Sequence, residues 1–233
     1  MKDLKEFQET IGYEFRDESL LRQALTHSSY ANEHHMKKLS DNERLEFLGD
    51  AVLEIVSSEF LYLNYTDLNE GKLSRLRASI VCEPTLAYIS KEINLGDYVL
   101  LSKGEDMTGG RTRKSILSDA FEATIGAIFL DGGIEPASAY IHRFVLNDIE
   151  HKQLFHDSKT RLQEVIQANY KEQLVYNLIS ESGPDHAKEF KVEAVVGNKV
   201  LGTGVGRTKK AAEQEAAYEG LMKLHKEESI NII

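Results

Sequence analysis

The period of the hydrophobic pattern changes once along this chain, and that change constrains the fold more than any other feature. In the first part, apolar residues recur at intervals of three and four positions, the period of a helix that buries one face. The segments with this period are SLLRQALTHSSYA, ERLEFLGDAVLEIVSSEFLYL, EGKLSRLRASIV, EPTLAYISKEI, SILSDAFEATIGAIFL and PASAYIHRFVLNDI. Alternating strand patterns are almost absent there, so we expect an all-α domain over residues 1–150.

A second pattern begins after the polar stretch EHKQLFHDSK, in which we place a linker over residues 151–157. The segment DSKTRLQEVIQANY predicts a helix capped by Asp157 or Ser158, and LVYNLISES and EFKVEAVV alternate as strands do. The dipeptide GN then turns into a third strand, KVLGTGVG, and TKKAAEQEAAYEGLMKL predicts a closing helix. The order α-β-β-β-α predicts a small α+β domain over residues 158–226, followed by a tail over 227–233.

The composition is that of a globular protein. The 233 residues suffice for one large domain or two modest ones, and 41% hydrophobic residues supply a core in either case. The single cysteine, Cys82, excludes an internal disulfide and a zinc site built from several cysteines. The start MKDLKEFQET lacks the apolar core of a signal peptide, and no stretch approaches the ~18 apolar residues of a spanning helix. We therefore expect a cytoplasmic protein with no membrane partner.

The formal net charge of −10 argues against a polyanionic partner, because phosphate binding is driven by cationic side chains. The charge is unevenly distributed, however. Residues 1–156 contain 17 Lys and Arg against 26 Asp and Glu, whereas residues 157–233 contain 11 against 12. The acidity belongs to the helical part, so it does not exclude a nucleic acid as the partner of the second domain.

Three carboxylates share one face of the helix predicted from DNERLEFLGD. Glu43, Glu46 and Asp50 are spaced i, i+3 and i+7. Ser40 and Glu43 fit the capping box S-x-x-E, so we expect the helix to begin just before the acids. The opposite face gathers the apolar residues Leu45, Leu48, Val52, Ile55 and Val56. Charged faces are common on surface helices, and taken alone this one needs no ligand.

A second acidic helix face favours a metal site over an ordinary charged surface. Asp119 and Glu122 are spaced i, i+3 in SILSDAFEATIG, on a helix whose other side is apolar. Like charges at such spacings repel by roughly 0.2–0.5 kcal/mol per pair, and a hard divalent cation removes that repulsion. Two such faces predict a shared, oxygen-lined site for Mg²⁺ or Mn²⁺. Phe47 projects on the acidic side of its helix, either as a lone exposed residue or as a contact for a partner subunit.

The segments LTHSSYANE, NERLEFLGD, EGKLSRLRASIV and SILSDAFEATIGAIFLD, in this order, resemble bacterial ribonuclease III, an endoribonuclease specific for double-stranded RNA. The α-β-β-β-α module resembles the double-stranded RNA-binding domain of that family. Ala51 departs from the pattern, since many members have Ser directly after the Asp that ends the second segment. We expect this change to affect only the support of neighbouring side chains.

The resemblance implies roles for the acidic residues. Glu46, Asp50, Asp119 and Glu122 would surround the catalytic Mg²⁺, for which Mn²⁺ is an alternative, and Glu43 and Glu70 would complete the acidic cleft. Family homodimers pair through the first acidic helix, which would make Phe47 a contact inserted into the partner. The implied reaction is hydrolysis of both strands by a metal pair, leaving 5′-phosphate and 3′-hydroxyl ends. Ribosomal RNA precursors are the implied substrates.

The resemblance also implies an RNA-binding surface on the second domain, which would read the shape of a duplex. Thr160, Gln163 and Glu164 would lie on one minor groove, the loop of Pro184, Asp185 and His186 would reach the next, and Lys209 and Lys210 would meet the phosphates between them. These lysines begin a predicted helix, whose N–H groups and dipole favour anions. The alternative for TKK alone is a solvated helix start.

The remaining motifs exclude other chemistries. Gly202, Gly204 and Gly206 have the wrong spacing for either phosphate-binding glycine motif, so we expect no nucleotide cofactor and interpret them as fitting a strand to a helix. None of the histidines forms H-E-x-x-H, and we interpret His27 as a hydrogen-bonded structural residue. Two other functions stay open on the residues: a protein that binds structured RNA without cutting it, and a metal-dependent phosphohydrolase of small molecules.

Overall fold

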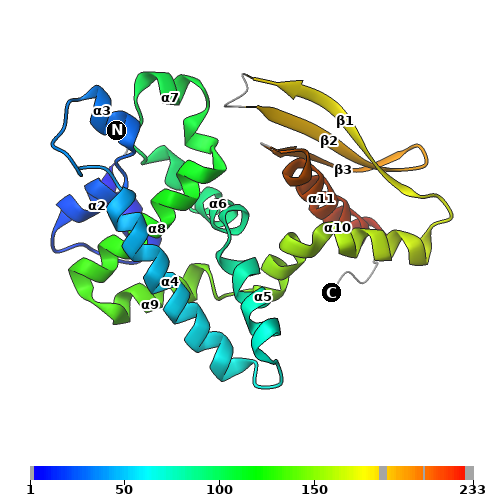
Figure 1. The fold of residues 1–233 in the computed structure, drawn as a ribbon, viewed down its shortest axis with the longest axis horizontal. Helices are drawn as coiled ribbons and strands as arrows, with labels where there is room; N and C mark the ends of the chain where they lie inside the picture. Colours follow the sequence, from blue (N-terminus) through cyan, green and yellow to red (C-terminus); the bar gives the residue numbers. More distant parts are fainter. Residues whose placement is uncertain (1–2, 184–187, 207, 229–233) are drawn as a thin grey trace. The chain divides into compact units, whose positions relative to one another are not determined.

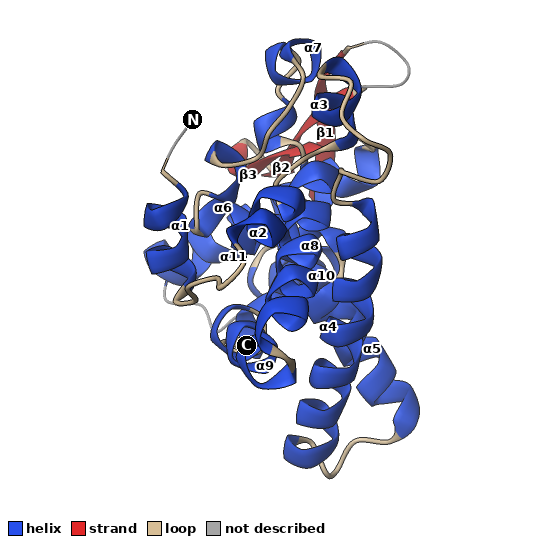
Figure 2. Ribbon diagram, turned by 90° about the vertical axis from the view of Figure 1, so that its left-hand side faces the viewer, coloured by secondary structure: helices blue, strands red, loops and turns tan. Residues whose placement is uncertain are grey.

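The computed structural model describes residues 3–183, 188–206 and 208–228, and the chain divides into two compact units, Met1–Ile149 and Glu150–Ile233. Figure 2 separates helices from strands by colour, and the strands in it are those of the second unit. Among the described residues, no helix is long and apolar enough to cross a membrane.

The first unit is helical. Its α-helices are α1 (Leu4–Ile11), α2 (Glu18–Ala24), α3 (Ser28–Glu33), α4 (Glu43–Asn64), α5 (Glu70–Val81), α6 (Glu83–Glu92), α7 (Lys103–Met107), α8 (Lys114–Gly132) and α9 (Ile134–Phe144). Two 3₁₀ turns, η1 (Leu95–Asp97) and η2 (Gly110–Thr112), flank α7. The predicted all-α class is confirmed.

The central element of this unit is α8, which packs against α2, α4, α6 and α9 (Figure 1). From Ile116 to Ile128 every residue of α8 is buried except Asp119 and Glu122, which are half-buried. A helix that is apolar nearly all round is a core helix. The two acids therefore occupy the one stripe of α8 that its neighbours leave partly open.

Two glycines bring α4 and α8 into backbone contact. A Cβ atom on Gly49 would lie 1.8 Å from the carbonyl oxygen of Glu122, and one on Gly126 would lie 2.2 Å from that of Leu45. Interhelical distance depends on the side chains at the contact, so glycine at both positions allows an unusually close crossing. This crossing lies one helical turn from Glu46 and directly at Glu122.

The capping of α4 differs from the sequence prediction. The helix begins at Glu43 with Asn42 as its N-cap, and no side-chain cap hydrogen bond forms there, so the capping box with Ser40 is wrong. The backbone N–H of Asn42 instead donates to the carbonyl of Thr26 at 2.9 Å, which ties the helix start to another segment. A tertiary contact thus replaces the local cap.

The buried face of α4 also differs from the prediction. Leu45, Val52 and Val56 are buried as expected, but Ile55 is 63% exposed and Leu53 is buried in its place. The crossing with α8 at Gly49 sets the buried face, and Ile55 lies outside it.

The periodic segment SLLRQALTHSSYA forms two helices rather than one. Helix α2 ends at Ala24, and the chain then extends so that Thr26 pairs with Leu100 in an isolated parallel bridge. Backbone hydrogen bonds join Leu100 to Leu25 at 2.7 Å and to His27 at 3.1 Å. The pairing ends the helix and places His27 at the N-cap of α3.

The second unit has the predicted α+β order. Its elements are α10 (Ile149–Asn169), β1 (Leu174–Ser182), β2 (Glu189–Val196), β3 (Lys199–Gly206) and α11 (Lys209–Glu228). The strands form an antiparallel sheet in the order β1-β2-β3, with Val195 and Val196 paired to Val200 and Lys199 across the turn at Gly197. One face of the sheet packs against α11, and Leu162, Ile166 and Leu221 are among the buried residues of this core.

The glycines of β3 serve the packing predicted for them. A Cβ atom on Gly202 would lie 2.3 Å from the carbonyl oxygen of Ala216, and one on Gly204 would lie 2.1 Å from that of Ala212. Only glycine admits so close an approach of α11 to the strand.

Helix α10 begins at Ile149, so the expected start at Asp157 or Ser158 is wrong. The stretch 151–157, for which we predict a linker, lies within this helix. Ser158 is fully buried, and its Oγ donates to the carbonyl of Gln214 at 2.7 Å, so this residue joins α10 to α11 rather than capping a helix.

Candidate active site

Carboxylates from α4 and α8 converge where the two helices cross. Glu46, Asp119 and Glu122 each offer an oxygen atom, and these atoms all lie within 4.8 Å of one another. All three side chains are half-buried. The close crossing at Gly49 and Gly126 positions them, because it brings the backbone of Glu122 against α4.

A pocket of about 370 Å³ opens beside this cluster. It is lined by His27, Ser28, Asn42, Glu43, Glu46 and Asp119. The start of α3 supplies the first two residues, as its N-cap and first helical residue, and the start of α4 supplies the next three. The acidic cluster therefore borders a space that a ligand can enter, with a histidine and an asparagine among its walls.

Burial dominates the electrostatics of the cluster. It raises the pKa of Glu122 to about 8, and the charges of Asp50, Glu46 and Asp119 add to the rise. Burial likewise raises the pKa of Glu46, with further contributions from the charges of Asp119, Glu43 and Asp50. Among the described residues, no cation lowers the pKa of either group, so a bound positive ion would favour their charged forms.

Opposing effects act on the pKa values of Asp119 and His27. Burial raises the pKa of Asp119, while a hydrogen bond from Ser118 opposes the rise. Burial lowers the pKa of His27, and the charge of Asp119 opposes that change. The imidazole is therefore favoured in its neutral form, beside carboxylates that form no ion pair within the described part of the chain.

The donor set fits a hard divalent cation. Among the residues that the structure describes, no lysine or arginine forms an ion pair with Glu46, Asp119 or Glu122. Three carboxylates without sulfur or imidazole among them favour an ion that prefers oxygen, such as Mg²⁺. The cluster can thus hold a divalent metal ion of this kind.

The other predicted acids differ in how they relate to the cluster. Asp50 is exposed on α4, and its charge acts on both Glu46 and Glu122. Glu43 is exposed at the start of α4 and lines the pocket. Glu70 is the first residue of α5 and accepts a hydrogen bond from Ser74 at 2.9 Å, and no described interaction joins it to the cluster.

Phe47 is 79% exposed on α4. Ile55 and Tyr62 follow on the same side of the helix, at 63% and 72% exposed. Their spacing of eight and seven residues keeps them on one face. Phe47 is therefore part of an apolar stripe along α4, defined by these three residues, and not an isolated exposed aromatic.

The second unit presents its predicted RNA-binding residues at two places. Thr160 and Glu164 are exposed on α10 and Gln163 is half-exposed beside them, opposite the side that packs on the sheet. Lys209 and Lys210 are the first two residues of α11, and both are exposed. The predicted loop contacts, Pro184, Asp185 and His186, lie outside the described residues.

The local sequence pattern does not predict the polar wall of the pocket, formed by His27, Ser28 and Asn42. From the sequence, His27 is expected to be structural, and Ser28 and Asn42 have no expected role. Asn42 is only 3% exposed, and its Nδ2 has no hydrogen-bond partner. A signal was present, because Asn42 begins the segment NERLEFLGD that also holds the acids, but its burial depends on contacts from distant parts of the chain.

A helical unit with a partly buried carboxylate cluster, followed by an α-β-β-β-α unit, is the architecture of an enzyme that acts on structured RNA. Comparison with known proteins gives the particular family. Residues 17–149 match the family model described as ribonuclease-III-like, and residues 158–224 match the double-stranded RNA binding motif. The chain belongs to the ribonuclease III family; it is an endoribonuclease with a domain that binds double-stranded RNA.

Individual relatives agree with this assignment. Ribonuclease 3 of Bacillus velezensis is 49% identical over 97% of this chain and 92% of its own length, and that of Bacillus cereus strain AH187 is 50% identical over 94% and 91%. A solved nuclease domain of ribonuclease III from Campylobacter jejuni is 45% identical, with a TM-score of 0.58, and covers 61% of this chain and 96% of its own. That structure is described as flexible in a region involved in dimer formation.

Proposed function

We propose that this chain is a Mg²⁺-dependent endonuclease that hydrolyses both strands of double-stranded RNA and leaves 5′-phosphate and 3′-hydroxyl ends. The observation that supports this most is the convergence of oxygen atoms of Glu46, Asp119 and Glu122 within 4.8 Å, without an ion pair to any lysine or arginine that the structure describes. Mn²⁺ also accepts oxygen ligands and is expected to substitute. Its substrates are precursors of ribosomal RNA and other structured messenger and transfer RNA transcripts in the cytoplasm.

In this proposal Glu46, Asp50, Asp119 and Glu122 hold the cation, and Glu43 extends the negative cleft toward the RNA. A bound divalent ion would supply Lewis acidity at the phosphate and a water of lowered pKa. The protein's own contribution is orientation. Half-burial restricts the rotamers of the carboxylates, and the hydrogen bond from Ser118 to Asp119 at 3.3 Å fixes one of them. Glu70 would join the cleft only on its RNA-facing side.

We assign catalysis and dimerisation to residues 1–150 and binding of the duplex to residues 158–226. The apolar stripe on α4 supports a homodimer, because an exposed row of large apolar side chains is stabilised when a partner covers it. In a two-fold symmetric dimer each Phe47 would contact the partner and the two active sites would serve the two strands. Thr160, Gln163, Glu164, Lys209 and Lys210, with His186, would contact the RNA.

A cleavage assay on a long RNA duplex, with and without Mg²⁺, tests the proposal. Wild-type protein is expected to cut only with the metal and to leave ends that a 5′-phosphate-dependent exonuclease can degrade. Glu122→Gln is expected to bind the duplex within about threefold of wild type and to lose at least about 100-fold of cleavage, because it removes one charged ligand. Glu92→Gln, an exposed acid on α6, is the matched control and should cut normally. Full activity of Glu122→Gln would remove this residue from the site.

A further inference from the structure

His27 is held between the acidic pocket and a polar network on its other side. It caps α3 with extended backbone angles, φ −70° and ψ 149°, and lines the pocket together with Glu46 and Asp119. Its Nδ1 accepts a hydrogen bond from the backbone N–H of Ser29 at 3.2 Å and lies 2.8 Å from the Ser29 Oγ. One ring nitrogen is thus fully used by α3.

These contacts fix the tautomer of the ring. A backbone N–H can only donate, so Nδ1 must be the unprotonated acceptor, and a neutral imidazole then carries its proton on Nε2. The Ser29 Oγ accepts from the backbone N–H of Ser102 at 3.1 Å, which leaves its own proton free to donate to Nδ1. Two donors therefore converge on Nδ1. Among the described residues no hydrogen bond involves Nε2.

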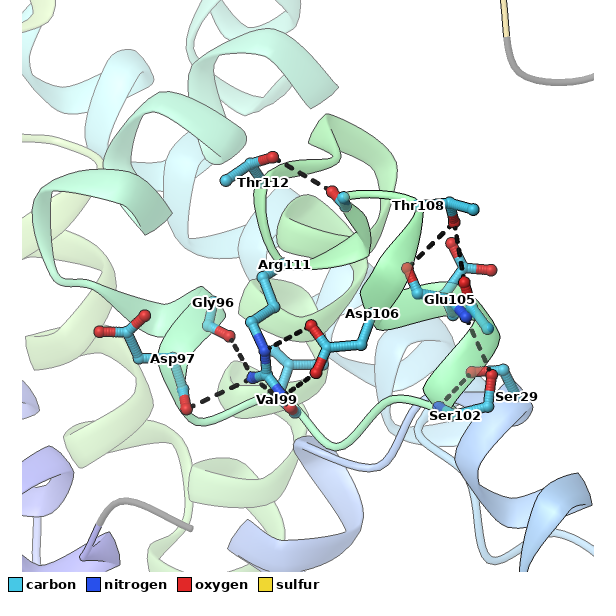
Figure 3. A network of polar contacts seen from close by, with 12 residues as sticks. Ser29, Gly96, Asp97, Val99, Ser102, Glu105, Asp106, Thr108, Arg111 and Thr112 are labelled. Atoms are coloured by element: carbon cyan, nitrogen blue, oxygen red, sulfur yellow. Dashed lines mark hydrogen bonds and ion pairs between the residues drawn. The ribbon is translucent and has the colours of Figure 1, made fainter. Parts of the chain in front are cut away.

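The segment from Ser102 to Arg111, whose first residue hydrogen-bonds to Ser29, has several polar contacts of its own (Figure 3). Ser102 caps α7 by accepting from the N–H of Glu105 at 3.2 Å, and the next backbone N–H, that of Lys103, donates to Glu33 on α3 at 3.1 Å. Arg111 anchors the far side of the segment, with both carboxylate oxygens of Asp106 at 2.8 and 2.9 Å. The position of Ser102, and through Ser29 that of His27, follows from this frame.

We propose that His27 is a substrate-contacting residue whose Nε2–H donates a hydrogen bond to a phosphate oxygen of the RNA in the acidic pocket, and that Ser29 is a positioning residue acting through it. The proposal rests on the proposed function of the same site. A phosphate beside Glu43, Glu46 and Asp119 gains from a nearby donor, and a neutral donor adds no charge that would repel a bound cation. Asn42 lines the same pocket, and its buried Nδ2 has no hydrogen-bond partner, so it is a second donor available to a ligand.

Two substitutions of His27 separate this role from a structural one. His27→Asn keeps an acceptor for the Ser29 N–H and is a favoured N-cap, but the shorter side chain cannot reach into the pocket. His27→Gln loses the cap acceptor but places an amide donor near the position of Nε2. If His27 contacts the phosphate, His27→Asn retains its melting temperature and loses about 10- to 100-fold in kcat, the usual effect of one hydrogen bond to a charged group. His27→Gln is then less stable but more active than His27→Asn.

A purely structural His27 would give the opposite order, with His27→Asn fully active and His27→Gln impaired, and that result would overturn the proposal. Metal affinity, measured by titration of Mg²⁺ alone, should be the same in His27→Asn and wild type, since the residue is not a ligand. If wild-type protein does not cleave double-stranded RNA at all, the proposed function has failed, whereas active wild type with equally active His27→Asn rejects only the role of His27.

The tautomer can be checked without any activity. In ¹⁵N-edited NMR spectra of wild-type protein, His27 should show a protonated Nε2 and an unprotonated Nδ1. Ser29→Ala removes one of the two donors to Nδ1, and a mixture of tautomers with a kcat loss smaller than that of His27→Asn is expected. A wild-type ring protonated at Nδ1 would contradict the arrangement.

Discussion

Glu122 shows, at the scale of one residue, that a side chain of the candidate site can lower the stability of the fold. The close crossing of α4 and α8 buries its carboxylate beside Glu46, Asp50 and Asp119, and the pKa rises to about 8. The folded protein therefore holds a proton that the unfolded chain, with a pKa near ~4.3, has already lost at neutral pH. Ionisation of Glu122 opposes folding until a cation offsets it.

The metal-free protein should consequently lose stability as pH rises. Because the pKa of Glu122 is raised in the folded state, its contribution to the free energy of unfolding is fully present below the pKa of the unfolded chain. That contribution is lost as pH rises through about 8. Glu122→Gln removes the titrating group, so without divalent metal its melting temperature should match wild type near pH 4.5 and exceed it by roughly 3 to 8 °C at pH 8.5. Calorimetry in the presence of a chelator measures this. The exposed Glu92→Gln is the control, and parallel pH curves for wild type and Glu122→Gln would contradict the burial of this acid.

At the scale of elements, the sequence determined the helices and strands better than their ends. Helical periodicity identified α4 and α8, and alternation placed β1, β2 and β3 at the residues where the structure has them. The spacing of acids on α4 and α8 was also enough to nominate Glu46, Asp119 and Glu122, since each lies on the less buried side of its own helix. Periodicity along one element is a local property, and the sequence displays it directly.

The misplaced features depend on other parts of the chain. Ser40 was expected to cap α4, but the backbone of Asn42 binds Thr26. A single helix was expected through His27, but Leu100 pairs with the chain and ends α2. Both differences involve residues far apart in sequence, which a local pattern does not contain. The polar wall of the pocket was missed for the same reason.

The hydrophobic periodicity also did not predict the close crossing of α4 and α8 at Gly49 and Gly126. The need for glycine at this crossing can be tested. Gly49→Ala places a methyl group where the carbonyl of Glu122 lies, so α4 and α8 must separate. We expect a loss of about 1 to 3 kcal/mol in the free energy of unfolding and a weaker affinity for Mg²⁺, because the acids move apart. Gly104→Ala on α7 meets nothing within 4 Å and should leave stability unchanged or raise it by up to about 1 kcal/mol. Denaturant unfolding compares the two, and an unaffected Gly49→Ala would show that the crossing tolerates more separation than its geometry suggests.

At the scale of the whole molecule, the apolar stripe on α4 predicts assembly. In a two-fold dimer Phe47→Ala removes two buried rings at once, and each is worth about 1.5 to 3 kcal/mol. The dissociation constant should rise at least about 100-fold, as measured by analytical ultracentrifugation. Met107→Ala on α7 removes a side chain that is 88% exposed and lies outside the stripe, so it serves as the control. Equal dissociation constants for Phe47→Ala and wild type would place the dimer contact elsewhere.

The division of charge along the chain predicts that the second unit provides most of the attraction for RNA. Residues 1–156 carry a net charge of −9 and repel a polyanion, whereas residues 157–233 are nearly neutral and expose Lys209 and Lys210 at the N-terminus of α11. The N–H groups at that end add to the attraction for phosphate. A phosphohydrolase of small molecules would gain nothing from these lysines, so their contribution separates the two functions.

Replacing both lysines tests this directly. In a Glu122→Gln background, which permits binding without cleavage, Lys209→Ser with Lys210→Ser should weaken duplex binding and lower the slope of log affinity against log salt by about 2, since each lost phosphate contact removes about 0.9. Lys226→Ser, about 25 Å away near the other end of the same helix, removes one positive charge but leaves Lys209 and Lys210 in place. Because it lies far from the proposed contact, its slope should stay at the starting value. A slope unchanged by the double substitution would mean that the phosphates are held by other residues, and the predicted role of α11 in reading the duplex would be wrong.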